Sequence, residues 1–239
     1  MLSPRERLWR LGLARELCDL QVARQYTPYK DGLQAAVLPE YTGLLHMYLL
    51  ANSEEAHAQA LLERFNPPEG ALIADVGCGT GRLTRLLQQE RIDLTFILLD
   101  GNLWHLRACP TDTGRVAADG QWLPLRAESV DVVLVSYALG YFLAAQLFFE
   151  AKQVLTVGGQ LVVYDLVAKD EAADLFLVTL GYKTYTMERL RQLAAGYGFK
   201  EQHIEVVASP VLSPLVADVP GVNVVLQEVE PVCCVWNKG

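Results

Sequence analysis

The spacing of hydrophobic residues changes near residue 66 of this chain. From residue 3 to residue 25 the apolar side chains recur at helical intervals, at Leu8, Leu11, Leu17 and Leu20. The segment also begins with the Ser-Pro-Arg-Glu pattern of a helix capping box. Similar patterns predict helices over residues 41–51 and 52–65. We therefore expect residues 1–66 to form an N-terminal helical cap.

Beyond residue 66, short apolar runs alternate with helical patterns. This alternation predicts strands at residues 71–76, 94–99, 115–118, 131–137, 160–167, 203–208, 222–229 and 232–237. We expect the last two to pair antiparallel through a turn at Glu230 and Pro231. Strands that alternate with helices need crossover connections, so the fold class is α/β, with a doubly wound, mostly parallel sheet over residues 67–239.

One segment competes as a membrane span, because residues 132–149 carry no charge and approach the length of ~20 that a bilayer requires. β-Branched residues fill its first half, Gly140 interrupts it, and Gln146 would lie in lipid. A buried strand followed by a helix explains this pattern better, so we expect no membrane span.

Composition and charge narrow the range of expected partners, metal sites and compartments. The 239 residues are 51% hydrophobic and 20% charged, and 20 Lys and Arg against 28 Asp and Glu give a net charge of −8. Such a surface disfavours nucleic acid as a partner. The five cysteines form no C-x-x-C pair and the four histidines are isolated, so we expect no metal site and a reduced compartment. Without a signal-peptide pattern at the N-terminus, we expect a cytoplasmic protein.

The chemistry of the chain is concentrated in a glycine-rich turn that follows the first predicted strand. Asp75, Gly77, Gly79 and Gly81 stand between an apolar run and the start of a helix. The dinucleotide fingerprint fails, because Arg82 and Thr84 stand where it requires Gly or Ala, and no Gly-Lys-Ser/Thr closes a phosphate-binding loop. A carboxylate at this turn favours a cationic ligand over a chain of phosphates.

The Asp-x-Gly-x-Gly-x-Gly run resembles the first motif of the class I S-adenosylmethionine-dependent methyltransferases. Further segments resemble later family motifs in the same order, namely 98–100, 118–124, 130–136, 155–161, with Val157 where the family has Pro, and 195–199. The resemblance spans roughly residues 70–239. It implies a Rossmann-like sheet of seven strands and S-adenosyl-L-methionine as the cofactor.

The resemblance also implies which residues bind this cofactor. The turn formed by Gly77, Cys78, Gly79 and Gly81 would face the methionine part, and Asp75 would act indirectly. The ribose hydroxyls would meet the fork of a carboxylate, which accepts two hydrogen bonds, and the adenine would meet polar and aromatic side chains. The residues so implied are Asp100 and Gly101 for the ribose, Asp119, Gly120, Gln121 and Trp122 for the adenine, and Ser136 at the end of the fourth strand. Because no histidine adjoins Cys78, we do not expect a catalytic thiol.

The nearest part of the family is the small-molecule branch that includes quinone and natural-product methyltransferases. Methyl transfer is an in-line displacement that mainly requires alignment and exclusion of water. The candidate catalytic residues are Tyr137, Tyr141 and His46. The motifs of DNA amino- and cytosine methyltransferases are missing after the fourth strand. The apolar composition suits a small lipophilic acceptor, and it equally suits the interface of a homo-oligomer.

Three alternatives stay open at this point. The chain could be a catalytically silent relative that serves as a partner or scaffold subunit. It could methylate protein or RNA, which would require an exposed groove. A nicotinamide-dependent oxidoreductase is disfavoured by Arg82, which stands where pyrophosphate binding needs close helix packing.

Overall fold

The computed structural model describes residues 54–173, 184–207 and 229–239. The chain divides into two compact units, and the sheet belongs mainly to the unit formed by Glu54–Val167, Tyr185–Ala208 and Pro231–Gly239. The helices predicted over residues 3–25 and 41–51 lie outside the described residues, as does most of the strand predicted at 222–229.

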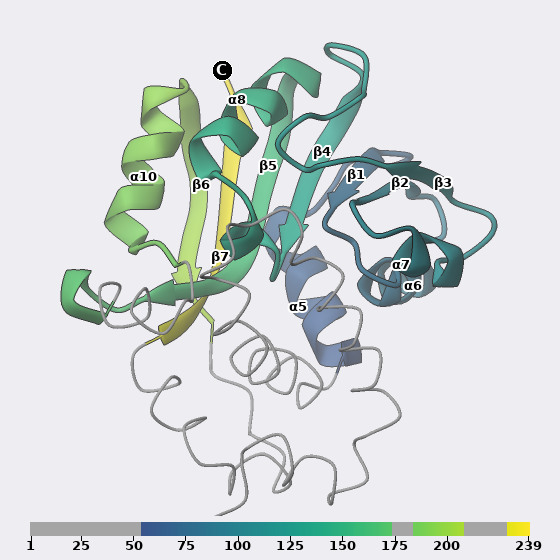
Figure 1. The fold of residues 1–239 in the computed structure, drawn as a ribbon, viewed down its shortest axis with the longest axis horizontal. Coiled ribbons are helices and arrows are strands. Elements are labelled where there is room, and N and C mark those ends of the chain that lie inside the picture. The colour runs from purple at the N-terminus through teal and green to yellow at the C-terminus, as the bar shows by residue number, and fades with distance from the viewer. Residues whose placement is uncertain (1–53, 174–183, 208–228) are drawn as a thin grey trace, which may run out of the picture. The chain divides into compact units, whose positions relative to one another are not determined.

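A seven-stranded sheet in the order β3-β2-β1-β4-β5-β7-β6 forms the centre of the fold (Figure 1). The pairs β1–β2, β1–β4, β2–β3 and β4–β5 are parallel, and β6–β7 is antiparallel. The predicted doubly wound, mostly parallel sheet is therefore confirmed. The strands are β1 (Leu72–Val76), β2 (Thr95–Asp100), β3 (Gly114–Ala117), β4 (Val130–Ser136), β5 (Leu155–Ala168), β6 (Phe199–Val206) and β7 (Val229–Lys238).

Helices cover both faces of this sheet. Buried residues of α8 and α10 share one hydrophobic core, and buried residues of α5, α6 and α7 share the other. The strands supply both cores by alternation, as the neighbours Cys233 and Cys234 show by joining opposite cores. This confirms that these two cysteines are packing residues. The helices are α5 (Glu54–Phe65), α6 (Arg82–Glu90), α7 (Leu103–Ala108), the 3-10 helix η2 (Leu139–Tyr141), α8 (Ala144–Val154) and α10 (Met187–Gly196).

The helix predicted over residues 52–65 corresponds to α5, which packs as part of the sheet-containing unit. Its side chains Ala58, Leu61 and Phe65 are fully buried in the same core as Leu87 of α6. The division into a cap over 1–66 and a domain over 67–239 stays a prediction, because residues 1–53 lie outside the described part.

The strands after β4 begin earlier than predicted: β6 begins at Phe199 rather than at residue 203, and β7 at Val229 rather than at residue 232. β5 begins at Leu155 rather than near residue 160, because its register with β4 shifts between Val130 and Val132 and so accommodates the residues around Gly158 and Gly159. The glycines indicate a turn in the sequence pattern, but here they belong to an irregular strand.

The predicted hairpin at Glu230 and Pro231 is wrong. β7 runs through both residues as one strand, and its antiparallel partner is β6. Pro231 lies near the beginning of the strand, where its missing N–H is tolerated, and its carbonyl oxygen accepts a hydrogen bond of 2.8 Å from Val207 N.

The uncharged segment over residues 132–149 divides into β4, η2 and the first half of α8. Of the helices that the structure describes, none has the length and apolar character needed to cross a membrane.

The core beneath α8 offers a direct test of packing. Phe148 is fully buried, with its ring centroid 6.1 Å from that of Phe199 and 5.5 Å from that of Trp236. We expect Phe148→Ala to lower the free energy of unfolding by about 3–5 kcal/mol, because it leaves a cavity. The neighbouring Phe149 is 43% exposed, so Phe149→Ala is the matched control, with an expected loss of about 1 kcal/mol or less. Urea unfolding of both variants measures the difference, and equal losses would contradict this description of the core.

Candidate functional site

The candidate site lies where β1 and β2 end. Gly77 N and Cys78 N donate hydrogen bonds of 2.8 and 3.1 Å to Leu99 O, near the end of β2. Gly79 N donates to Asp100 Oδ2 over 2.9 Å. Because ligands of parallel α/β sheets bind at the carboxyl ends of the strands, the structure brings the predicted glycine turn and the predicted ribose-binding acid together where a ligand would bind.

The three glycines of the turn differ in their surroundings. All have positive φ, at 76° for Gly77, 55° for Gly79 and 68° for Gly81. A Cβ on Gly77 would lie 2.6 Å from Ala138 Cβ, and one on Gly81 would lie 3.0–3.2 Å from three side-chain atoms. Among the described residues, no atom comes within 4 Å of a Cβ on Gly79. The turn is therefore closed toward the core at its ends and open at its middle glycine.

Helix α6 begins directly after this turn. Gly81 is its N-cap residue and supplies no side chain to the first amides of the helix. The amide groups of a helix N-terminus attract partial negative charge, such as that of a carboxylate. A ligand with a carboxylate at one end fits this position.

Asp75 ties the end of β1 to α6. Its carboxylate is 2% exposed and accepts a hydrogen bond of 2.6 Å from Thr84 Oγ1. Burial raises the pKa of Asp75 from 3.8 to about 6, the Thr84 hydroxyl opposes this shift, and the nearby Asp100 adds to it. This geometry supports an indirect role, in which Asp75 shapes the turn from beneath.

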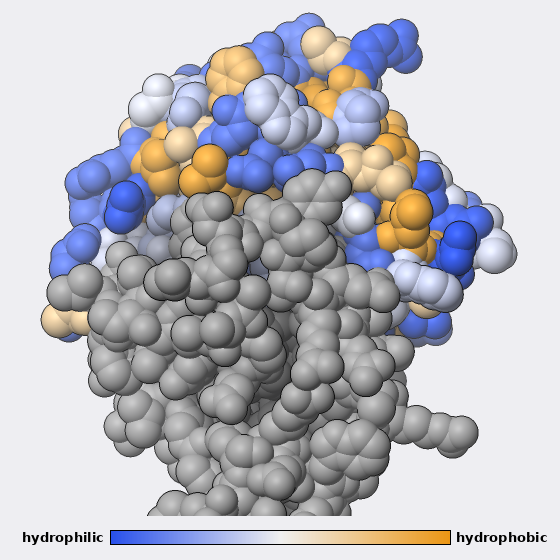
Figure 2. Space-filling model, viewed as in Figure 1, coloured by the Kyte–Doolittle hydropathy of each residue, from blue (hydrophilic) through white to orange (hydrophobic). Residues whose placement is uncertain are grey.

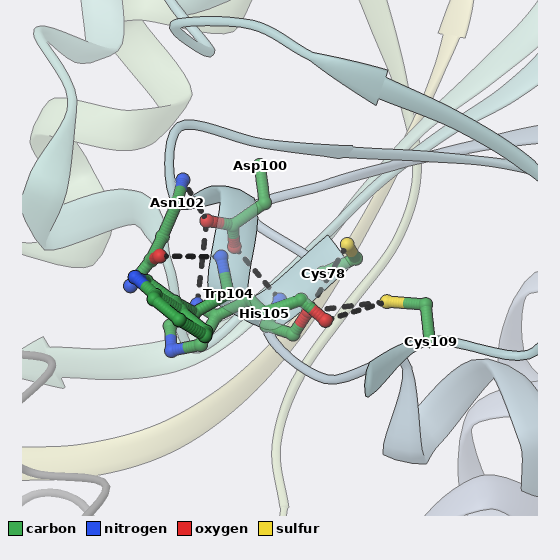
Figure 3. Close-up of polar contacts among 7 residues, drawn as sticks. Cys78, Asp100, Asn102, Trp104, His105 and Cys109 are labelled. Carbon is green, nitrogen blue, oxygen red and sulfur yellow. Dashed lines mark hydrogen bonds and ion pairs between the residues drawn. The ribbon is translucent and has the colours of Figure 1, made fainter. Parts of the chain in front are cut away.

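The Asp100 carboxylate connects the glycine turn to the start of α7 (Figure 3). It is 5% exposed, and besides Gly79 N it accepts a hydrogen bond of 2.8 Å from Asn102 N. The same oxygen, Oδ1, lies 3.3 Å from His105 Nδ1. The side chain is therefore held in one orientation by groups from two loops.

Sequence reasoning missed two residues of this cluster, Asn102 and His105. Asn102 begins α7, and its Oδ1 accepts a hydrogen bond of 2.9 Å from Trp104 N. Its Nδ2 is buried and has no hydrogen-bond partner among the described residues. An Asn before a short helical pattern is a recognisable N-cap signal and could have identified Asn102. His105 has no such signal, because its contact with Asp100 depends on the turn between β2 and α7.

Two thiols meet the backbone of the turn (Figure 3). Cys78 Sγ and Cys109 Sγ lie 3.5 and 3.3 Å from Gly79 O, as donors to that carbonyl oxygen. Burial raises the pKa of both thiols, and the nearby carboxylates of Asp75 and Asp100 add to the shift. Cys78 is therefore a neutral thiol at neutral pH, which argues against nucleophilic catalysis.

The loop after β3 carries the predicted adenine-binding residues. Asp119 is exposed, and its carboxylate accepts a hydrogen bond of 2.9 Å from Gln121 N. Gln121 Oε1 accepts one of 3.1 Å from Leu143 N, so this side chain links the loop to the segment before α8. Trp122 is 66% exposed. Gly101, which follows β2, is also exposed. The adenine-binding role of these residues stays a prediction.

Of the predicted catalytic residues, two lie just beyond β4 and one is not described. Tyr137 directly follows Ser136, the last residue of the strand, and has a φ of 50°. Its N donates to Tyr164 O over 2.8 Å, and the two rings meet edge to face at 5.4 Å. Tyr141 ends η2. His46 lies outside the described residues. A non-glycine residue at positive φ is uncommon and often marks a functional segment.

Within the described ranges, no group of three or more His, Cys, Asp and Glu side chains could hold a metal ion. His105 and Asp100 are close to each other, but they are not part of a metal-binding group of three among the side chains that the structure describes.

The burial of Asp75 predicts that the free energy of unfolding depends on pH. Because its folded-state pKa of about 6 exceeds the unfolded value, the folded protein binds more protons between about pH 4 and 6. Its contribution to stability is therefore greatest below pH 4 and is lost as the pH rises through 6, by on the order of 2–3 kcal/mol.

Urea unfolding from pH 4 to 8 should show a flatter profile for Asp75→Asn than for the wild type. Thr84→Val should move the loss to higher pH, because it removes the hydroxyl that lowers this pKa. Asp112→Asn, an exposed acid, is the control. If Asp75→Asn leaves the profile as steep as the control does, the assignment is wrong.

Comparison with known proteins agrees with this geometry. A family described as a methyltransferase domain matches residues 74–163, which run from β1 to β5 and include the glycine turn, Asp100 and Ser136. No curated protein matches the chain by sequence.

Several solved structures share the fold. One is a geranyl diphosphate methyltransferase in complex with GPP and sinefungin, at a TM-score of 0.67 and 14% identity, covering 77% of this chain and 78% of that one. Another is geranyl diphosphate C-methyltransferase from Streptomyces coelicolor A3(2), at a TM-score of 0.64 and 11% identity, covering 78% and 81%. A third is the [4+2]-cyclase SpnF, at a TM-score of 0.65 and 17% identity, covering 77% and 81%. Residues 74–163 therefore match a methyltransferase domain family, and the chain has a Rossmann-like methyltransferase fold.

Proposed function

We propose that this chain binds S-adenosyl-L-methionine and transfers its methyl group to a small organic acceptor. The observation that carries the proposal is the junction of the glycine turn with Asp100, through the 2.9 Å bond from Gly79 N. The turn is open beside Gly79, and the buried carboxylates of Asp75 and Asp100 both lie near it. Two carboxylates favour a sulfonium cation over a pyrophosphate.

The residues present fit the parts of this donor. The first amides of α6 would take the methionine carboxylate, because a helix N-terminus attracts negative charge, and the open turn beside Gly79 would leave room for it. Asp100, beside Gly101, would take the ribose hydroxyls. Asp119, Gly120, Gln121 and Trp122 would surround the adenine, with the exposed Trp122 ring as the stacking surface. When bound, the donor supplies an activated methyl group and its own leaving group.

The protein's part in the reaction is alignment and exclusion of water. Ser136 ends β4, the strand next to β1, and Tyr137 and Tyr141 follow it, so these residues would meet an acceptor beside the donor. Burial raises the pKa of Tyr164, whose side chain hydrogen bonds with Tyr137. The Tyr164 phenol is therefore neutral at pH 7 and would serve Tyr137 as a hydrogen-bond partner rather than as a base.

A small and partly apolar acceptor is favoured by two observations. Exposed apolar side chains follow three strands on the β1 side of the sheet: Leu103 and Trp104 after β2, Trp122 after β3 and Leu143 after β4. In the view of Figure 2, hydrophobic residues of the described surface occur in separate areas among hydrophilic ones. Two of the similar structures are also methyltransferases of geranyl diphosphate.

Donor binding is tested by isothermal titration calorimetry with S-adenosylhomocysteine. We expect Asp100→Ala to weaken binding by about 1–3 kcal/mol, because it leaves the hydroxyls and Gly79 N without their acceptor. Asp112→Ala, at an exposed position, is the matched control and should bind as the wild type does. Wild-type affinity in a folded Asp100→Ala variant would refute the assignment, and tighter binding of NADH than of S-adenosylhomocysteine would refute the function.

Methyl transfer is tested separately by release of S-adenosylhomocysteine from S-adenosylmethionine. Small-molecule extracts should support turnover, and RNA or protein fractions should not. Turnover on the polymers alone would favour the alternative substrate class. Donor binding without turnover on either would favour a catalytically silent subunit.

A further inference from the structure

The ring of Phe142 packs against two glycines that belong to different loops of the proposed donor site. A Cβ on Gly120, in the loop after β3, would lie 2.5 and 2.6 Å from ring atoms Cε1 and Cζ of Phe142. A Cβ on Gly77, in the turn after β1, would lie 3.3 Å from the same Cζ. Gly120 therefore has no room for a side chain while the ring stays where it is, and the same ring packs tightly on Gly77, where Ala138 Cβ at 2.6 Å is the main obstacle.

At position 120, the contact with the Phe142 ring rather than the backbone conformation explains why the residue is a glycine. Gly77 has a positive φ, which already favours glycine, whereas Gly120 is not among the described glycines with positive φ. Alanine could adopt the backbone of Gly120, so the obstacle is the ring of Phe142 together with Val76 Cγ1 at 2.9 Å.

The segment over residues 138–144, which carries Phe142, is held from three other elements. Leu139 N donates to Asp165 Oδ2 of β5 over 2.8 Å, and Leu143 N donates to Gln121 Oε1 over 3.1 Å. Tyr185 holds the C-terminal end of this segment. Its hydroxyl accepts a hydrogen bond of 3.1 Å from Ala144 N and donates one of 3.3 Å to Phe142 O. The ring is therefore attached to a segment whose backbone has little freedom.

Asp165 shows how firmly the segment is held. Its carboxylate is 3% exposed, and burial raises its pKa to about 7 against the opposing effect of hydrogen bonds from the backbone of Ala138, Leu139 and Leu166. A buried acid is costly unless its hydrogen bonds are made. Here they are made by the backbone of the segment that carries Phe142 and by that of β5 itself.

We propose that Phe142 is a positioning residue of the methyl-transfer site, whose ring sets the separation of the Gly77 turn from the Gly120 loop. Asp165, Gln121 and Tyr185 hold the ring in place. Because the same segment follows Tyr137 and contains Tyr141, it links the donor loops to the side on which the acceptor is expected. This inference rests on the proposed function. It adds the residue that keeps the Gly77 turn and the Gly120 loop at a fixed separation.

The test is a double-mutant cycle on donor affinity. S-adenosylhomocysteine is titrated by calorimetry into the wild type, Gly120→Ala, Phe142→Leu and the double variant, and Tm is recorded for each. We expect Gly120→Ala to weaken binding at least about tenfold, because the ring must leave its position. Phe142→Leu should weaken it less, and Gly120→Ala should have less than about a threefold effect in the Phe142→Leu background.

This rescue separates positioning from stability, because the affinity of folded protein does not depend on Tm. If Gly120→Ala weakens binding equally in both backgrounds, or not at all, the inference is overturned. A wild type that binds no S-adenosylhomocysteine overturns the proposed function and this inference with it, whereas wild-type binding with additive effects overturns this inference alone.

A second pair of variants covers the case in which Gly120→Ala does not fold. Tyr185→Phe removes the hydroxyl that holds Phe142 O and Ala144 N, and we expect it to weaken binding about threefold or more. Tyr197→Phe removes a hydroxyl at the end of α10, outside the segment, and is the matched control. Equal affinities in these two variants would overturn the inference.

Discussion

The hydrogen bond from Gly79 N to the Asp100 carboxylate is the constraint on which the site depends. Gly79 lies in the turn after β1 and Asp100 ends the neighbouring parallel strand β2, so the sheet brings them together, but strand pairing stops at Val76 and Leu99. Beyond that point the loops are held by the bonds from Gly77 N and Cys78 N to Leu99 O and by the Asp100 side chain. The Asp100 carboxylate thus fixes the middle of the turn, at Gly79, beyond the two backbone bonds that hold its start.

Buried aspartates also hold loops near the ends of other strands of the sheet. Asp75, Asp100 and Asp165 are all buried, and each accepts hydrogen bonds from a segment that follows a different strand or begins a helix. Burial of a carboxylate opposes ionisation, as the raised pKa values of Asp75 and Asp165 show. A site that binds a cation offsets part of that cost, because positive charge stabilises the ionised form. The three acids therefore hold the geometry of the loops, and under the proposed function the charge of Asp75 and Asp100 would also favour a cationic ligand.

The sequence predicted the sheet well where the signal is local. The strands β1 to β4 are short apolar runs bounded by turn residues, and their predicted positions agree with the structure to within about one residue. The errors arose where tertiary pairing overrides local pattern. Gly158 and Gly159 lie within the irregular first part of β5, and Pro231 is tolerated at the start of a strand that pairs with β6.

The residues of the candidate site likewise fall into two groups: those that a local sequence motif identifies and those that only the tertiary structure reveals. Asp75, the glycine turn and Asp100 form a motif with fixed spacing, so sequence alone identifies them. His105 and Phe142 carry no motif, because their contacts depend on how a loop returns to the sheet. Gln121 was predicted as an adenine contact, and its bond to Leu143 N could not be foreseen, because the two residues are 22 positions apart.

The fold by itself does not decide the reaction, since a [4+2]-cyclase shares it with the methyltransferases. What distinguishes the outcomes is how closely the acceptor approaches the donor methyl group, because in-line displacement needs contact and alignment whereas a cyclisation does not. In this chain the segment after β4 is held from β5, from the loop after β3 and from Tyr185, and it packs directly on the donor loops through Phe142. A rigid connection between the two sides of the site is costly to build, and it is useful where two reactants must meet at a fixed distance. Under the proposed function, this arrangement would hold donor and acceptor at the fixed distance that in-line methyl transfer requires.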